Sequence, residues 1–100
     1  MPSVVWTPHA LQCVHRLHTF LSCKNAKAAE SAATALFRHA EILEQFPNAG
    51  RKALDLDPDQ RELLVPFGTA GYVILYHLDS ATGTVTILAI RHQREVGYST

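Results

Sequence analysis

The amino-acid sequence predicts an α+β fold: a short N-terminal strand, then an αα-hairpin, then a three-stranded antiparallel meander. Three observations lead to this prediction. Two stretches repeat apolar residues at the spacing of one helix face, and three later stretches are rich in β-branched and aromatic residues. Short spacers that contain glycine separate the three later stretches, as in β-hairpins. At 100 residues the chain has room for one modest core, so we expect residues 1–100 to form a single domain.

The first strand leads directly into the first helix. Residues 4–6 form a β-branched and aromatic run, and we expect Trp6 to lie in the core. Thr7 is a typical N-cap, and Pro8 suits the first helical position because its missing N–H has no partner there. The helix should extend from residue 8 to about residue 21. Its apolar face contains Leu11, Val14, Leu17, His18 and Leu21.

A second helix is predicted from residue 25 or 26 to about residue 46. Its apolar face begins with small residues, which let another backbone come close, so the two helices should pack as an αα-hairpin. Pro47 ends the helix, and a turn at 48–50 follows. The apolar face contains Ala28, Ala29, Ala32, Ala33, Leu36, Ala40, Leu43 and Phe46.

The three later strands are predicted over residues 61–67, 72–78 and 84–91, after a polar loop at 51–59. The spacers between them have the length and the glycine content of hairpin turns. Consecutive strands joined in this way pair antiparallel, which predicts the meander.

The last strand is apolar on both faces and ends in polar and aromatic side chains. Strict alternation would place Val85, Ile87 and Ala89 on one face and Leu88 and Ile90 on the other. A strand without a polar face is predicted to be central and covered on both sides. The residues that follow include Arg91, His92, Arg94 and Tyr98. Groups held at the end of a rigid element are well placed for binding, although arginine and histidine also end strands as solvated caps.

The charge of the chain argues against a strongly basic protein. Nine Lys and Arg residues balance nine Asp and Glu residues, and the pI is about 7.0. Proteins that rely on phosphate contacts usually carry a marked basic excess. Any basic surface here must therefore be made by folding.

Cysteine usage and the absence of long apolar runs predict a cytoplasmic protein. Cys13 and Cys23 lie ten residues apart on one predicted helix, about 15 Å by helical rise. Disulfide geometry requires Cα atoms within about 7 Å, so these two residues cannot pair with each other. Two free thiols and no secretion signal are typical of a reducing compartment. No run of apolar residues is long enough for a membrane span.

Five short segments, in order, resemble the RelE/ParE superfamily of toxins from bacterial type II toxin–antitoxin operons. The segments 5–11 and 44–51 resemble the family's first strand with its helix start and its P-x-x-G-R helix exit. The segments 61–65, 72–76 and 87–95 resemble its three C-terminal strands. The similarity covers nearly the whole chain, and the tail from Arg91 to Tyr98 is closer to ParE-like members.

The resemblance implies one of two toxic activities. ParE-like toxins inhibit DNA gyrase and block replication without catalysing a reaction themselves, and this is the leading interpretation. RelE-like toxins are endoribonucleases that cut messenger RNA on the ribosome. A third hypothesis is a non-toxic relic that keeps only its antitoxin-binding surface.

The candidate target-binding residues lie at the start of the first of these strands, at the end of the last one and in the tail. They are Arg61, Arg91, His92, Arg94 and Tyr98. RNA cleavage needs groups that transfer protons and cations around the phosphate, so the RelE-like alternative would use Arg61, His92, Arg94 and Tyr98. Simpler roles remain open: Arg61 pairing with Asp59 or Glu62, His92 as a hydrogen-bonding strand end, and Tyr72 and Tyr76 stacked in the core.

A toxin of this class implies a neutralising ParD-like antitoxin and a toxin–antitoxin hetero-oligomer. We expect the antitoxin to lay an amphipathic helix or an added strand across apolar surface beside the helical hairpin. The candidate antitoxin-binding residues are Leu11, Val14, Leu17, Leu21 and Leu36. The neutral chain does not predict the sign of the partner's charge. The sequence shows no phosphate loop, and apart from the weak spacing of His15 and His18 it shows no metal motif, so neither a cofactor nor a metal is expected.

Overall fold

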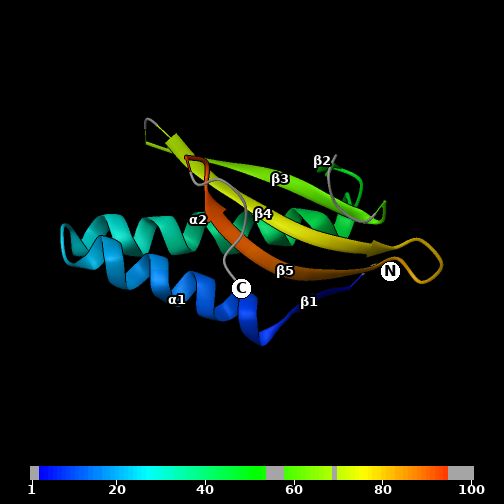
Figure 1. Ribbon diagram of the computed structural model, residues 1–100, viewed down its shortest axis with the longest axis horizontal. Helices are drawn as coiled ribbons and strands as arrows, with labels where there is room; N and C mark the ends of the chain where they lie inside the picture. The colour runs from blue at the N-terminus through cyan, green and yellow to red at the C-terminus, as the bar shows by residue number, and fades with distance from the viewer. Residues whose placement is uncertain (1–2, 54–57, 69, 95–100) are drawn as a thin grey trace.

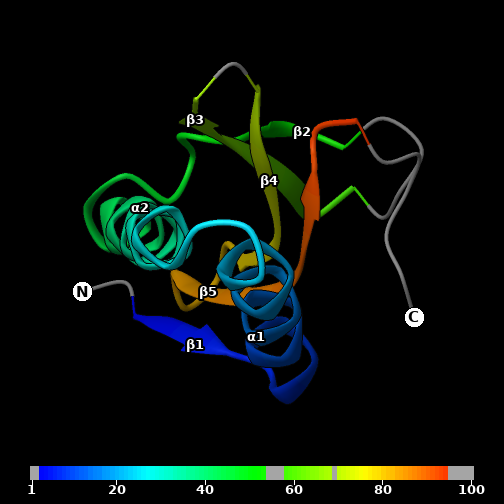
Figure 2. The same cartoon turned by 90° about the vertical axis from the view of Figure 1, so that its left-hand side faces the viewer.

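Two helices cover one face of a five-stranded sheet (Figure 1). The computed structural model describes residues 3–53, 58–68 and 70–94, and every structural statement below refers to them. The helices lie side by side, with α1 against β5 and α2 against β3 and β4 (Figure 2). The elements in chain order are β1 (Val4–Trp6), α1 (Pro8–Ser22), α2 (Ala26–Gln45), β2 (Arg51–Lys52), β3 (Gln60–Phe67), β4 (Ala70–Asp79) and β5 (Thr84–His92).

The strand order in the sheet is β1-β5-β4-β3-β2. Strands β3, β4 and β5 form the predicted antiparallel meander, and β5 has a neighbour on each side as expected. Strand β1 pairs parallel with β5, which joins the two ends of the chain. The polar loop predicted at 51–59 is wrong at its start, because Arg51 and Lys52 pair with Glu62 and Arg61 as the short edge strand β2. Two exposed basic residues carry no apolar alternation by which a strand is recognised.

The predicted helix starts are confirmed by their caps. Thr7 Oγ1 accepts a hydrogen bond from the Ala10 N–H at 3.1 Å and donates to the Ile87 carbonyl at 2.8 Å. One hydroxyl thus caps α1 and ties it to β5. The Asn25 side chain accepts from the Ala28 N–H at 3.1 Å and caps α2. Neither helix within the described residues is long and apolar enough to cross a membrane.

The core lies between the helical layer and the sheet. Small residues on α2 bring its backbone close to the neighbouring elements, and larger side chains fill the remaining space. Trp6 packs against the core from the edge of the sheet but is only half-buried, so its predicted place in the core is confirmed in part. The fully enclosed core includes Ala10, Ala29, Leu36, Leu43, Val65, Ile74, Tyr76, Val85, Ile87 and Ile90.

A β-bulge in β5 changes which side chains face the helices. Leu75 pairs with Ala89 and Tyr76 with Ile87, so Leu88 is an extra residue without a partner on β4. After the bulge the register shifts by one. Ile90 therefore joins Val85 and Ile87 on the inner face, in place of the Ala89 that strict alternation predicted.

The shifted register also sets the direction of the strand end. His92 lies opposite Tyr72, which shares the inner face with Ile74 and Tyr76. Its neighbour Arg91 lies opposite Val73 and therefore on the outer face. The bulge thus turns His92 toward the helices and Arg91 away from them.

Candidate functional site

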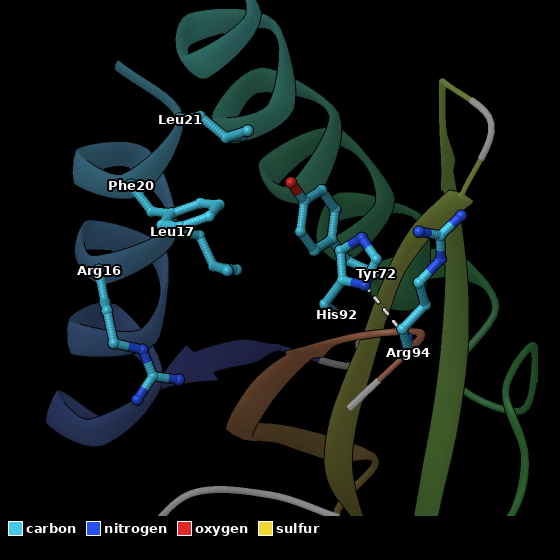
Figure 3. A pocket seen from close by; sticks show the side chains of 7 residues that line it. All are labelled: Arg16, Leu17, Phe20, Leu21, Tyr72, His92 and Arg94. Carbon is cyan, nitrogen blue, oxygen red and sulfur yellow. Dashed lines mark hydrogen bonds between the residues drawn. The ribbon is translucent and has the colours of Figure 1, made fainter. Parts of the chain in front are cut away.

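An apolar hollow of about 500 Å³ opens between α1 and the ends of β4 and β5 (Figure 3). Four of its residues come from α1 and three from the sheet side. The volume of the hollow is within the range of pockets that bind a ligand or an anchoring side chain. The lining residues are Arg16, Leu17, Phe20, Leu21, Tyr72, His92 and Arg94.

The α1 wall combines half-buried leucines with exposed groups. Leu17 and Leu21 pack against the core from its edge, whereas Phe20 is 60% exposed. The Lys24 ammonium lies 4.6 Å from the centre of the Phe20 ring, a cation–π contact that holds the ring beside the hollow. Arg16 is exposed on the same side of the helix.

The sheet wall is built from stacked rings. The Tyr72 ring meets the edge of the His92 ring with centroids 5.5 Å apart and an angle of 86° between planes. Phe67 on β3 packs against Tyr72, with ring centroids 6.1 Å apart. The Arg94 backbone N–H donates to His92 Nδ1 at 3.1 Å. These contacts fix a rigid aromatic wall at the strand end.

The hollow is suited to binding an apolar side chain. None of its lining residues is a carboxylate, and neither Arg16 nor Arg94 forms an ion pair within the described residues. Burial raises the pKa of Tyr72 above 10.0, so its phenol stays protonated at neutral pH and does not act as a base. In the described part of the chain, no three His, Cys, Asp or Glu side chains gather as metal ligands.

Arg61 lies in a separate cluster at the exit of α2. Its Nη1 donates to the Gly50 carbonyl at 2.8 Å. The Tyr76 hydroxyl accepts from the Gly50 N–H at 2.9 Å and donates to the Pro47 carbonyl at 2.8 Å. Burial raises the pKa of Tyr76, against the lowering effects of the Gly50 hydrogen bond and of Arg61. Within the described residues Arg61 forms no ion pair with Asp59 or Glu62, the two partners that its simpler role would use.

Arg91 lies on the outer face of the sheet, in an ion-pair network. Its Nη2 lies 3.6 Å from one Glu62 carboxylate oxygen, and Arg51 Nε lies 3.6 Å from the other. Its Nη1 also donates to the carbonyls of His92 and Gln93. Both Arg91 and Glu62 are largely shielded from solvent. The network ties β2, β3 and the end of β5 together.

Comparison with known proteins places this fold in a toxin family. Residues 4–97 match the family described as the ParE toxin of the type II toxin–antitoxin system parDE. This chain belongs to the ParE toxin family. It is also 34% identical over 95 residues to Toxin RelE3 of Caulobacter vibrioides, a match that covers 95% of this chain and 98% of that protein.

Solved toxin–antitoxin structures share the fold of this ParE-family chain. A chain of the chromosomal ParDE system from P. aeruginosa superposes with a TM-score of 0.75 at 20% identity, over 92% of this chain and 96% of that one. A chain of the RelBE2 complex from Mycobacterium tuberculosis superposes with a TM-score of 0.61 at 23% identity, over 91% and 96%. At these identities the likeness shows the fold alone.

The predicted target-binding residues of this ParE-family chain do not form one cluster. His92 and Arg94 meet at the hollow, Arg61 is held at Gly50, and Arg91 lies on the opposite face of the sheet. Tyr98 lies outside the described residues. Of the four predicted residues that the structure describes, only His92 and Arg94 thus lie together.

The predicted antitoxin-binding residues divide in the same way. Val14 and Leu36 are buried in this chain's own core, so neither is available to a partner while the fold is intact. Leu11 is 46% exposed but does not line the hollow. Leu17 and Leu21 line it, beside His92 and Arg94. The surfaces predicted for antitoxin and for target therefore overlap.

Three residues of the hollow were missed from the sequence as site residues. Arg16 and Phe20 lie one helical turn apart on α1, outside its buried face, and Tyr72 was assigned to the core alone. An aromatic residue that falls outside the apolar face of an amphipathic helix is the signal that points to Phe20. No local signal identifies the wall made by Tyr72 and His92, because it depends on the bulge at Leu88.

Proposed function

We propose that this ParE-family toxin inhibits DNA gyrase and blocks replication, with the hollow as its contact surface. The observation that carries the proposal is the separation of the residues that RNA cleavage would need. His92 and Arg94 border an apolar hollow, whereas Arg61 is bound to the fold elsewhere. Such an arrangement suits protein binding through an aromatic and apolar patch with arginines at its rim.

The separation follows from the register of β4. His92 lies opposite Tyr72, and Arg61 lies opposite Tyr76 on the other side of the strand. Four residues of strand span about 13 Å, and groups that act on one scissile phosphate must lie within about 3 Å of it. Arg61 would have to leave its hydrogen bond to Gly50 and move along the sheet to join His92.

Expression in cells separates the two toxic activities. We expect induction of the chain alone to arrest DNA synthesis and to trigger DNA damage signalling while protein synthesis continues at first. The Phe20→Ala and Arg94→Ala variants should lose much of this effect, because each removes a side chain from the proposed contact. Arg38→Ala, an exposed arginine on the outer side of α2, is the matched control. Arrest of translation before replication would contradict the proposal.

A RelE-like ribonuclease is the second candidate, and one observation favours it. The relative that is 34% identical to this chain is named a RelE toxin. The test is messenger RNA cleavage on ribosomes by wild type, His92→Ala and Arg61→Ala. Cleavage by wild type that both substitutions abolish, with the variants folded, would establish this alternative.

The proposed antitoxin is a ParD-like protein whose amphipathic segment covers the hollow. Leu17 and Leu21 offer apolar contacts on one wall of the hollow, and Arg94 borders it from the sheet side (Figure 3). Because antitoxin and gyrase would then use one surface, binding of one should exclude the other. Co-expression with the protein encoded beside this gene should restore growth, and purified antitoxin should restore supercoiling in proportion to its concentration.

A further inference from the structure

A second, smaller hollow of about 130 Å³ lies at the border between β1 and α2. Its volume is about four times the share of one water molecule in the liquid, so it suits a single side chain. Its residues differ in character from those of the larger hollow. They are Val4, Trp6, Phe37, Ala40, Glu41 and Glu44.

Two aromatic rings form one side of this small hollow. The Trp6 and Phe37 rings lie 4.9 Å apart with planes tilted by 49°. Phe37 is nevertheless 39% exposed, and Trp6 is half-buried. The faces of such rings attract a cation placed within about 6 Å, and tryptophan attracts it most strongly.

Two carboxylates form the other side. Glu41 and Glu44 are exposed and lie three residues apart on one side of α2, together with Phe37. Neither forms an ion pair within residues 3–53, 58–68 and 70–94, and no basic residue lines this hollow. Two unpaired carboxylates beside exposed rings are complementary to a positive charge.

The backbone beside the small hollow is a free sheet edge. Among the described strands, β1 has a neighbour on one side only. The Ser3 carbonyl and the Thr7 N–H bond to β5, so the backbone groups of Val4 and Trp6 point away from the sheet. An added strand would pair with these two residues, whose side chains line the hollow.

We propose that this border binds an extended segment of the antitoxin, which pairs with β1 and places an arginine or lysine between the rings and the carboxylates. The proposal rests on the proposed antitoxin partner and adds the chemistry of a second anchor. Side chains on one face of an added strand would lie beside Val4 and Trp6 and reach the α2 carboxylates. A helix would leave the outward backbone groups of β1 unpaired.

The test uses the antitoxin encoded beside this gene and the Glu41→Gln/Glu44→Gln double variant. We expect its affinity for the antitoxin to fall roughly tenfold, because two charge contacts beside a ring are lost. Glu30→Gln, an exposed glutamate near the start of the same helix, is the control and should bind as wild type does. Both variants alter only exposed side chains, so they should fold as wild type does and should still arrest growth in the absence of antitoxin. Circular dichroism checks their folding.

Two readouts report on the site itself. Trp6 is the chain's sole tryptophan, so with an antitoxin free of tryptophan, or with each tryptophan of the antitoxin replaced by phenylalanine, its fluorescence reports directly on this hollow. We expect antitoxin to change that fluorescence in wild type and less in the double variant. Each arginine and lysine of the antitoxin is also replaced in turn by glutamine. At one of these positions, the loss of binding free energy should not add to the loss caused by Glu41→Gln/Glu44→Gln.

Each alternative outcome is distinct. Equal affinity of wild type and double variant, or additive losses at every basic position, would overturn the cation site and leave the proposed function standing. A fluorescence change that depends on the concentration of this chain without antitoxin would show that a second copy occupies the edge. No binding of wild type to the antitoxin would overturn the proposed partner as well.

Discussion

Arg61 and Arg94 show how one residue type serves two purposes in this fold. Arg61 is held in a closed cluster, where it donates to the Gly50 carbonyl and lies beside Tyr76. Arg94 borders an open apolar hollow and forms no ion pair within the described residues. A polar group with internal partners thus stabilises the fold, whereas one at the border of an unfilled apolar surface is available to a partner. Changes in the closed cluster should therefore alter stability, and changes at the hollow should alter toxicity.

The largest effect is expected from Gly50→Ala. An added Cβ would lie 2.6 Å from the Tyr76 hydroxyl oxygen and 2.8 Å from the Glu62 carbonyl oxygen, both too close. The hydroxyl is held by two hydrogen bonds, so it cannot move aside without losing them. We expect the free energy of unfolding to fall by about 3 kcal/mol, measured by urea denaturation. A loss below about 1 kcal/mol would show that the cluster is more adaptable than its contacts indicate.

Tyr76→Phe tests the hydrogen bonds of the cluster without changing its packing. It removes the acceptor for the Gly50 N–H and the donor to the Pro47 carbonyl. Leaving these buried groups unpaired should cost about 2 kcal/mol of unfolding free energy. Tyr72→Phe is the matched control on the same face of β4. It should cost less than about 0.5 kcal/mol, because the Tyr72 hydroxyl forms no hydrogen bond with the part of the chain that the structure describes. Equal losses in the two variants would contradict the account.

The arginine pair gives the direct comparison. Arg61→Ala should lower the free energy of unfolding by about 1 kcal/mol, since the Gly50 carbonyl loses a charged donor. Arg94→Ala should leave stability within about 0.5 kcal/mol and reduce growth arrest. Urea denaturation and growth curves on the same proteins check both halves. If Arg61→Ala were as stable as wild type, or Arg94→Ala as toxic as wild type, the distinction between the two sites would be lost.

The smallest effect is expected from pH. The pKa of Tyr76 is raised above 10.0 in the folded protein, so the contribution of its neutral phenol is fully present below pH 10.0. As the pH rises further, the unfolded phenol ionises first and this contribution is lost. Between about pH 8 and about pH 10.5, the free energy of unfolding should therefore fall more for wild type than for Tyr76→Phe, as measured by urea denaturation at both pH values. Identical losses would show that Tyr76 does not carry this dependence.

Much of the fold was predictable because its signals are local. The caps at Thr7 and Asn25 and the hairpin spacers lie within a few residues of what they specify. The parallel pairing of β1 with β5 joins residues about 80 positions apart and has no such signal. The bulge at Leu88 reverses which alternate residues face inward, so residue parity alone misplaced Ala89 and Ile90.

The site was less predictable for the same physical reason. The sequence identified His92 and Arg94 at a strand end and Leu17 and Leu21 on a helix, but assigned them to different surfaces. Their meeting depends on how α1 lies along β5 and on the shifted register. The role of Arg61 depends on a carbonyl at Gly50, and a backbone acceptor has no sequence signature.

Supercoiling by purified DNA gyrase is the sharpest test of whether the apolar hollow is the surface that binds the target. We expect wild-type protein to inhibit supercoiling, and we expect the Phe20→Ala/Arg94→Ala double variant to need at least about tenfold more protein for the same inhibition. A folded Arg61→Lys variant, which keeps a donor near Gly50, should inhibit as wild type does. Unchanged supercoiling at saturating wild-type protein, or full inhibition by the double variant, would contradict the claim that the hollow is the target-binding surface.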